Sequence, residues 1–220
     1  MHRRTKITGS TWLLAAAWLV PSAVSAQALA APEGWKTSAE RFVAMPPGFH
    51  ITTSGSVLLY DPDARGGGDY AVESDGFLFP GASGGTYGLL IGGSGLDSDD
   101  AVWTSFEIGR DGNWVVRTRA HRDGEHLPVV SDRLGPEPGP VVLPGENSTG
   151  QNVLRIEVGD ESVAFLLNGE RVGELPRAEV SVEGIAGFRV GVDIDLHLIS
   201  FDIISEDTVR SFAPAREEDS

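Results

Sequence analysis

The sequence predicts an all-β protein built as a two-sheet antiparallel sandwich. Three observations lead to this fold class. Short apolar runs recur roughly every ten residues, a spacing typical of sandwiches and barrels. Turn-forming residues separate these runs, and glycine alone accounts for 28 of the 220 residues. No segment between the runs carries a helical period, so an alternation of strands with helices is not expected.

Each expected strand is a short apolar run bounded by Gly, Asp, Asn or Pro. Residues 132–150, "DRLGPEPGPVVLPGENSTG", are rich in Pro and Gly and are expected to form one long loop that divides the strands into two groups. In chain order the expected strands are residues 48–55, 56–61, 69–79, 86–93, 102–109, 114–121, 153–159, 162–168, 170–176, 185–192 and 195–204.

The stretch "WTSFEIGRDGNWVVRTRAH", residues 103–121, predicts a hairpin with a defined register. "RDG" at 110–112 suits a three-residue turn of type I in which Gly112 takes the left-handed conformation. A register slipped by one residue would mix apolar and charged side chains on the same face. The preferred register pairs Ile108 with Trp114, Phe106 with Val116 and Thr104 with Thr118, all pointing into the core.

The opposite face of this hairpin is polar and carries one large aromatic residue. We expect it to bind a ligand through Trp103, Glu107, Arg117, Arg119 and His121. Trp103 would stack on a sugar ring, and the charged side chains would supply planar hydrogen bonds. This hypothesis requires an accessible Trp103 and a buried Trp114. The alternative is an ordinary solvated sheet face on which the arginines pair with acidic neighbours.

The N-terminus predicts export. Residues 1–26 have a basic start, an apolar run from Trp12 to Val20, and small residues at the −3 and −1 positions before Gln27, as in a secretory signal peptide. A second cut after Ala30 fits as well, and the pair Arg3-Arg4 leaves twin-arginine export open. The apolar run is shorter than a membrane span requires. We therefore expect a periplasmic or extracellular protein with no membrane insertion after cleavage.

The charge of the chain argues against two classes of partner. It carries 32 acidic and 17 basic side chains, a formal net charge of −15. Signal-peptide removal would make the rest more negative still, because residues 1–26 hold basic residues and no acidic ones. Such a surface repels phosphate backbones and anionic lipids, so binding to nucleic acid or a membrane surface is not expected. There is no cysteine, and therefore no disulfide or lipid-anchor site.

Two long segments resemble a known superfamily. "NVLRIEVGDESVAFLLNGERVGELP" (152–176) followed by "GIAGFRVGVDIDLHLISFDI" (184–203) looks like the end of a concanavalin A-like jelly roll. More narrowly, with "GFHITTSGSVLLYDPDARGGGDYAVESDGFLFP" (48–80), the chain is similar to secreted bacterial 3-keto-disaccharide hydrolase-like domains of unknown function. The resemblance covers roughly residues 47–204. It implies a sandwich whose concave face binds carbohydrate in many members, and it transfers no catalytic residues.

Hydrolysis remains the alternative function. Retaining glycosidases of this fold carry Glu-x-Asp-x-x-Glu on one strand, since retention needs two carboxylates about 5 Å apart. This sequence has no such run. The candidate acids are Glu73, which shares one side of a strand with Asp75, and Glu107 of the hairpin.

The organisation expected from the sequence is therefore a single sandwich. Its parts are a signal peptide (1–26), a lead-in segment (27–46), the β-sandwich (47–205) and a flexible acidic tail (206–220). The expected function is that of a non-catalytic carbohydrate-binding or surface-interaction module that binds its ligand on a concave sheet face. The alternative is hydrolysis of (3-keto-)disaccharides or related glycosides. No cofactor is expected, although aspartates in 60–69 and 96–101 leave a structural calcium ion open.

Overall fold

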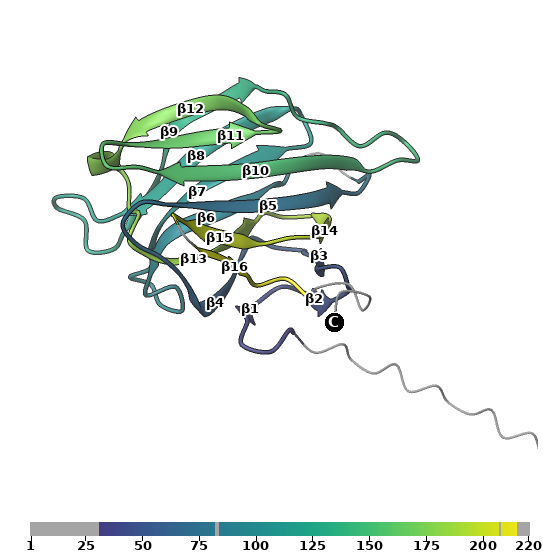
Figure 1. Cartoon of the computed structure of the whole chain (residues 1–220), viewed down its shortest axis with the longest axis horizontal. Coiled ribbons are helices and arrows are strands. Elements are labelled where there is room, and N and C mark those ends of the chain that lie inside the picture. Colours follow the sequence, from purple (N-terminus) through teal and green to yellow (C-terminus); the bar gives the residue numbers. More distant parts are fainter. Residues whose placement is uncertain (1–30, 82–83, 207, 215–220) are drawn as a thin grey trace, which may run out of the picture.

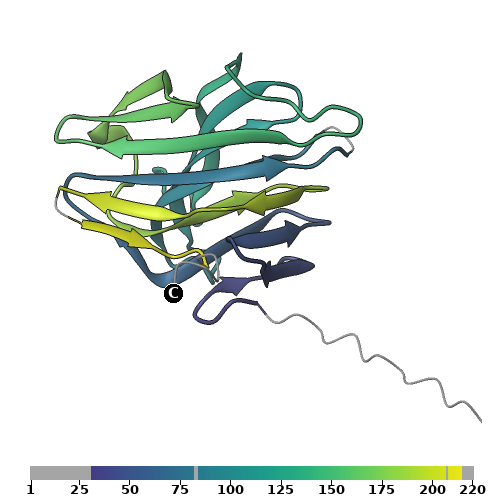
Figure 2. The same ribbon diagram turned by 45° about the vertical axis from the view of Figure 1, so that its right-hand side comes forward.

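The computed structural model describes residues 31–81, 84–206 and 208–214, and these residues form two antiparallel sheets packed face to face (Figures 1 and 2). The all-β sandwich expected from the sequence is confirmed. The strands are β1 (Lys36–Thr37), β2 (Arg41–Ala44), β3 (Phe49–Thr52), β4 (Val57–Gly66), β5 (Tyr70–Leu78), β6 (Thr86–Ser94), β7 (Val102–Gly109), β8 (Asn113–Ala120), β9 (Val129–Pro138), β10 (Gly150–Val158), β11 (Ser162–Leu167), β12 (Glu170–Pro176), β13 (Gly184–Val190), β14 (Asp195–Leu198), β15 (Asp202–Ser205) and β16 (Thr208–Ser211).

The chain crosses repeatedly between the two sheets. The seven-stranded sheet has the order β1-β4-β13-β6-β7-β8-β9. The nine-stranded sheet has the order β12-β11-β10-β5-β14-β3-β2, and β15 joins it by pairing with β5 and with β16. Neighbouring strands are therefore often distant in sequence, as β13 and β6 are. This is the winding of a jelly roll rather than of a simple meander.

One large hydrophobic core fills the space between the sheets. Inward-facing residues alternate along each strand with outward-facing ones, as the pleat requires. Phe106 of β7 meets Phe165 of β11 across the interface, with ring centroids 5.5 Å apart. Phe188 and Phe201 lie 4.6 Å apart in the same way. A second, smaller apolar cluster lies outside this core, on the outer face of the seven-stranded sheet. Its members are Tyr60, Leu90, Leu96, Ala101 and Trp103.

The sandwich extends beyond the expected boundaries. β1 and β2 belong to the segment 27–46 expected as a lead-in, and β16 belongs to the expected tail 206–220. The expected loop 132–150 is also partly wrong, because β9 continues to Pro138 and pairs with β8. The Pro and Gly residues there predict a loop, but an edge strand tolerates both residue types. The expected signal peptide, residues 1–26, lies outside the described residues.

Helix is almost absent from the described part of the chain. Its one helical segment is a single 3-10 turn, Arg177–Glu179. Accordingly, no described helix has the length and apolar character needed to cross a membrane.

Candidate functional site

The β7–β8 hairpin has the predicted turn and register. Gly112 adopts a φ of +82°, and its N–H donates to the Gly109 carbonyl at 3.2 Å. Ile108 pairs with Trp114, and Phe106 with Val116, both facing the core. Trp114 is 4% exposed, as the register requires. The outer face of the hairpin carries Trp103, Ser105, Glu107, Val115, Arg117 and Arg119.

Glu107 lies at the centre of this outer face and is completely buried. Its two carboxylate oxygens accept hydrogen bonds from four side chains. The donors are Thr86 Oγ1 (2.5 Å), Ser105 Oγ (2.6 Å), Arg117 Nη1 (2.9 Å) and Arg189 Nη1 (2.6 Å). A buried carboxylate is tolerated only when it is paired and hydrogen-bonded. Glu107 is therefore an anchor for two arginines, and its oxygens are already engaged.

The sheet register explains how Arg189 reaches Glu107 from two strands away. Arg189 of β13 pairs with Gly88 of β6, and Gly88 pairs in turn with Glu107 of β7. The three residues form one row across the sheet. Because Gly88 has no side chain, nothing stands between the guanidinium and the carboxylate.

Trp103 is buried, and the expectation of an accessible Trp103 is wrong. Its exposed fraction is 4%, the same as that of Trp114. Tyr60 of β4 and the segment before β7, with Leu96 and Ala101, cover it. Arg189 also lies over its ring, with Cζ 5.5 Å from the centroid. The period of the strand correctly assigned Trp103 to the outer face, but it carries no information about which segments cover that face.

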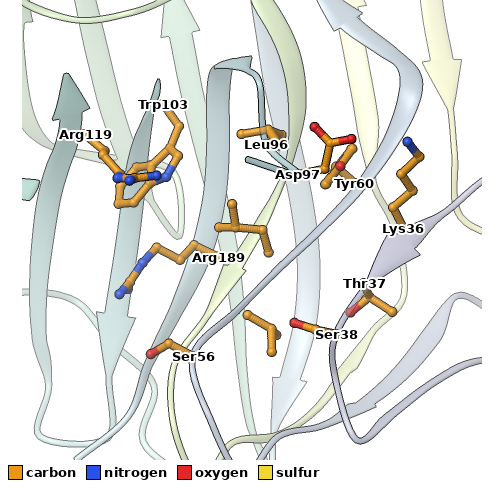
Figure 3. Close-up of a pocket in the computed structure, with 12 residues that line it drawn as sticks. Lys36, Thr37, Ser38, Ser56, Tyr60, Leu96, Asp97, Trp103, Arg119 and Arg189 are labelled. Atoms are coloured by element: carbon orange, nitrogen blue, oxygen red, sulfur yellow. The ribbon is translucent and has the colours of Figure 1, made fainter. Parts of the chain in front are cut away.

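A pocket of about 490 Å³ opens on this outer face, between β4 and the β7–β8 hairpin (Figure 3). Trp103 and Tyr60 contribute aromatic walls, and Leu58 and Leu96 add apolar surface. Arginine, lysine, aspartate and hydroxyl groups supply the polar lining. The lining residues are Lys36, Thr37, Ser38, Ser56, Val57, Leu58, Tyr60, Leu96, Asp97, Trp103, Arg119 and Arg189.

The charged groups of the pocket divide between its two sides. Figure 3 shows Arg119 and Arg189 near Trp103, with Lys36 and Asp97 on the side of Tyr60. Lys36 Nζ lies 6.0 Å from the centre of the Tyr60 ring. Burial, together with the negative charge of Asp97, raises the pKa of Tyr60 above its usual value. Tyr60 therefore stays a neutral phenol at physiological pH.

Some of the predicted site residues lie apart from the pocket. Arg117 lies between Glu107 and Asp132, 2.9 and 2.8 Å from their carboxylates, and does not line the pocket. His121 is exposed in the segment after β8 and is not among the lining residues. Of the predicted ligand-binding residues, only Trp103 and Arg119 line the pocket directly.

The two candidate catalytic acids are not brought together. Glu73 faces outward from β5 in the nine-stranded sheet, where Arg155 Nη1 lies 3.0 Å from its carboxylate. Glu107 faces outward from the seven-stranded sheet. The core between the sheets therefore separates them, and they do not form an acid pair.

Sequence reasoning missed most of the pocket wall. Arg189 follows inward-facing Phe188 in "GFRV", so strand alternation could have assigned it to an outer face. Tyr60 follows inward-facing Leu59 in "SVLLYD", so the same alternation assigns Tyr60 to an outer face. No pattern in the sequence indicates that β13 lies between β4 and β6, because these pairings join residues roughly 90 to 130 positions apart.

Metal-ligating side chains are not clustered in the described residues. No group of three or more His, Asp or Glu side chains in the described ranges is arranged to hold a metal ion. The aspartates of 60–69 and 96–101 therefore form no such group either.

Comparison with known proteins supports the fold. No family model matches the sequence, and no curated protein sequence matches it either. The structure resembles the carbohydrate-binding module CBM66 from Bacillus subtilis (TM-score 0.55, 18% identity), with 78% of this chain and 96% of that chain covered. It also resembles a Bacillus subtilis protein of unknown function with a galectin-like fold (TM-score 0.52, 13% identity), with 77% of this chain and 88% of that chain covered.

A third similar structure is the carbohydrate recognition domain of Emp47p. Its TM-score is 0.50 at 8% identity, and 79% of this chain and 89% of that chain are covered. The chain therefore has the galectin-like, concanavalin A-like jelly-roll fold that its sequence resembles. At these identities the comparisons establish the fold alone.

Proposed function

We propose that the protein is an exported glycan-binding module whose site is the pocket on the outer face of the seven-stranded sheet. The observation that carries this proposal is the composition of the pocket wall. Trp103 and Tyr60, which are largely buried, line the pocket with the small part of their surface that remains exposed, together with a few polar groups that can orient sugar hydroxyls. Its volume lies in the range usual for small-ligand sites. Similar structures named as carbohydrate-binding domains support the same reading.

Binding is favoured over hydrolysis by the carboxylates of the pocket. Among the described residues Asp97 is the one carboxylate that lines it, and Glu107 beneath it is engaged by four donors. Canonical glycosidases need two carboxyl groups flanking the scissile bond. We therefore propose a non-catalytic role, in which Glu107 holds Arg189 in place instead of transferring a proton.

The proposal is tested by filling the pocket. Ser56 is exposed and lines the pocket, so that Ser56→Trp would place a bulky side chain in it without disturbing the core. Thr208→Trp, at an exposed position in β16, is a matched control. Purified wild-type protein and both variants would be applied to a glycan array, and their thermal melts compared.

We expect wild type and Thr208→Trp to bind the same glycan, and Ser56→Trp to lose that binding with an unchanged melting temperature. Absence of binding by the wild type to any glycan would overturn the proposal. So would full binding by a folded Ser56→Trp variant, because the site would then lie elsewhere. Release of reducing sugar from a bound glycan would favour the hydrolytic alternative.

A further inference from the structure

The three cations of the pocket are not equally neutralised. Arg189 Nη1 lies 2.6 Å from the Glu107 carboxylate. Arg119 donates from Nη2 to the backbone carbonyl of Asp99 at 2.6 Å, but within the described ranges no carboxylate lies within 4.0 Å of its guanidinium. A guanidinium has five N–H donors, so Arg119 keeps donors to offer a ligand.

Some arginines of the described residues pair with a carboxylate on the surface, as in Arg133–Glu179 and Arg177–Glu183. Within the same residues Arg119 makes no such pair, and this matters because Arg119 lines the pocket. Figure 3 shows its side chain beside Trp103. Its positive charge is therefore presented at the pocket wall without a carboxylate to neutralise it.

The arrangement gives the pocket two chemically different ends. Arg119 and Arg189 make the end near Trp103 positive, because Glu107 is shared between Arg189 and Arg117. The other end, on the side of Tyr60, carries one positive and one negative side chain, Lys36 and Asp97 (Figure 3). An anion placed near Trp103 would meet two guanidinium groups and would be kept away from Asp97.

We propose that the ligand of this pocket is an acidic glycan whose anionic group binds beside Trp103, between Arg119 and Arg189. This inference rests on the proposed function and narrows it to a class of glycan. The planar fork of Arg119 matches the two oxygens of a carboxylate, as in a uronic acid. A sulfate ester presents the same kind of oxygens, so the shared chemistry is an oxyanion on a sugar. Asp97 would accept hydrogen bonds from hydroxyls at the other end.

The test compares acidic and neutral probes of the same shape. The probes are trigalacturonate, its carboxyl-reduced neutral trisaccharide, and a sulfated galactose trisaccharide, titrated calorimetrically. The variant is Arg119→Gln, and Arg119→Lys retains the charge without the fork. The control is Arg171→Gln, which removes one positive charge from an exposed position on β12 of the other sheet. Thermal melts establish that each variant is folded.

We expect at least one acidic probe to bind about tenfold or more tightly than the neutral one, as charge-assisted hydrogen bonds predict. Arg119→Gln should remove this preference, Arg171→Gln should keep it, and Arg119→Lys should keep part of it. Preference for trigalacturonate identifies a carboxylate, and preference for the sulfated probe identifies a sulfate.

Three results would overturn the inference while the proposed function stands. The first is equal or tighter binding of the neutral probe, and the second is an acidic preference that survives in Arg119→Gln. The third is failure of all three probes while a neutral glycan binds on the array. Failure of every glycan on the array overturns the proposed function, and the inference with it.

Discussion

Glu107 has no exposed surface, yet its carboxylate contacts two guanidinium groups and two hydroxyls. Taking a charge out of water is costly, and it is offset here by the number of donors and their short distances. The arginines keep 19–24% of their side-chain surface exposed, so that they retain partial contact with water. Glu107 and its two arginines therefore form one hydrogen-bonded charge network on the outer face, and they do not act as independent ligand-binding residues.

Removing the charge of Glu107 should be costly. Glu107→Gln leaves Arg117 and Arg189 without their shared carboxylate, and we expect a loss of roughly 2–4 kcal/mol, slightly below the usual range for a fully buried pair. Glu73→Gln is the control, because the Glu73–Arg155 pair is about one-third exposed and should contribute at most ~1 kcal/mol. Urea unfolding measures both. Equal small effects would mean that the network contributes little to stability.

Trp103 should behave as a core residue. Because Trp103 and Trp114 are equally buried, Trp103→Ala and Trp114→Ala should each cost ~3–5 kcal/mol, the usual range for truncation of a large buried aromatic. Thermal and urea unfolding of the two variants would measure this. Wild-type stability in Trp103→Ala would show that its cover is loose in solution and that the ring is accessible.

At the scale of elements, β6 sets the spacing of the strands on the outer face that carries the pocket. It lies between β13 and β7, and Gly88 occupies the row that joins Arg189 to Glu107. A Cβ on Gly88 would lie 1.8 Å from the carbonyl oxygen of Phe106. The close approach of β6 and β7 therefore depends on a glycine at this position.

Gly88→Ala should force these two strands apart. We expect a loss of about 2 kcal/mol or more, within or above the range for overpacked cores. The control is Gly55→Ala, where an added Cβ would meet nothing within 4 Å. That variant should stay within about 0.5 kcal/mol of wild type. A Gly88→Ala protein as stable as the control would contradict the packing of β6 against β7.

The pairing of β3 with β14 should make stability depend on pH. His50 and His197 are directly paired across these strands. Burial lowers the pKa of His50 below 6.5, although the negative charge of Asp195 acts in the opposite direction. The positive charges of Arg41 and His197 lower this pKa further. In the unfolded chain His50 takes up a proton near pH 6.5, whereas in the fold it does so only at lower pH. Stability is therefore lost as pH falls below about 6.5.

Urea unfolding between pH 8 and pH 5 would measure this dependence. In His50→Gln, which removes the titrating group, the loss of stability on acidification should be smaller than in wild type. Identical pH profiles for the two proteins would show that His50 does not contribute.

At the scale of the whole molecule, the sandwich separates two outer faces. The pocket lies on the seven-stranded sheet, and Glu73 lies on the nine-stranded one. The whole chain has a formal net charge of −15, whereas the pocket contains three cations and one carboxylate among its described lining residues. Non-specific attraction of anions is therefore weak, and selectivity must come from short-range contacts.

The intact protein should also be processed on export. Expressed in a bacterial host with its own N-terminus, it should be recovered outside the cytoplasm with Gln27, or the residue after Ala30, at its start. Mass spectrometry of the exported protein measures this directly. An exported chain that retains residue 1, or a chain that stays in the cytoplasm, would contradict the proposed export.

The sequence by itself determined the fold class and the β7–β8 register, including the burial of Trp114. These features depend on local signals: strand spacing, alternation along a strand, and the turn chemistry of Gly112. Only the tertiary structure decided that Trp103 is covered, that Glu107 is an anchor, and that Arg189, Tyr60 and Lys36 share a pocket with Arg119. The reason is physical: β1, β4 and β13 reach this face through pairings between residues far apart in the chain, and burial depends on those distant neighbours.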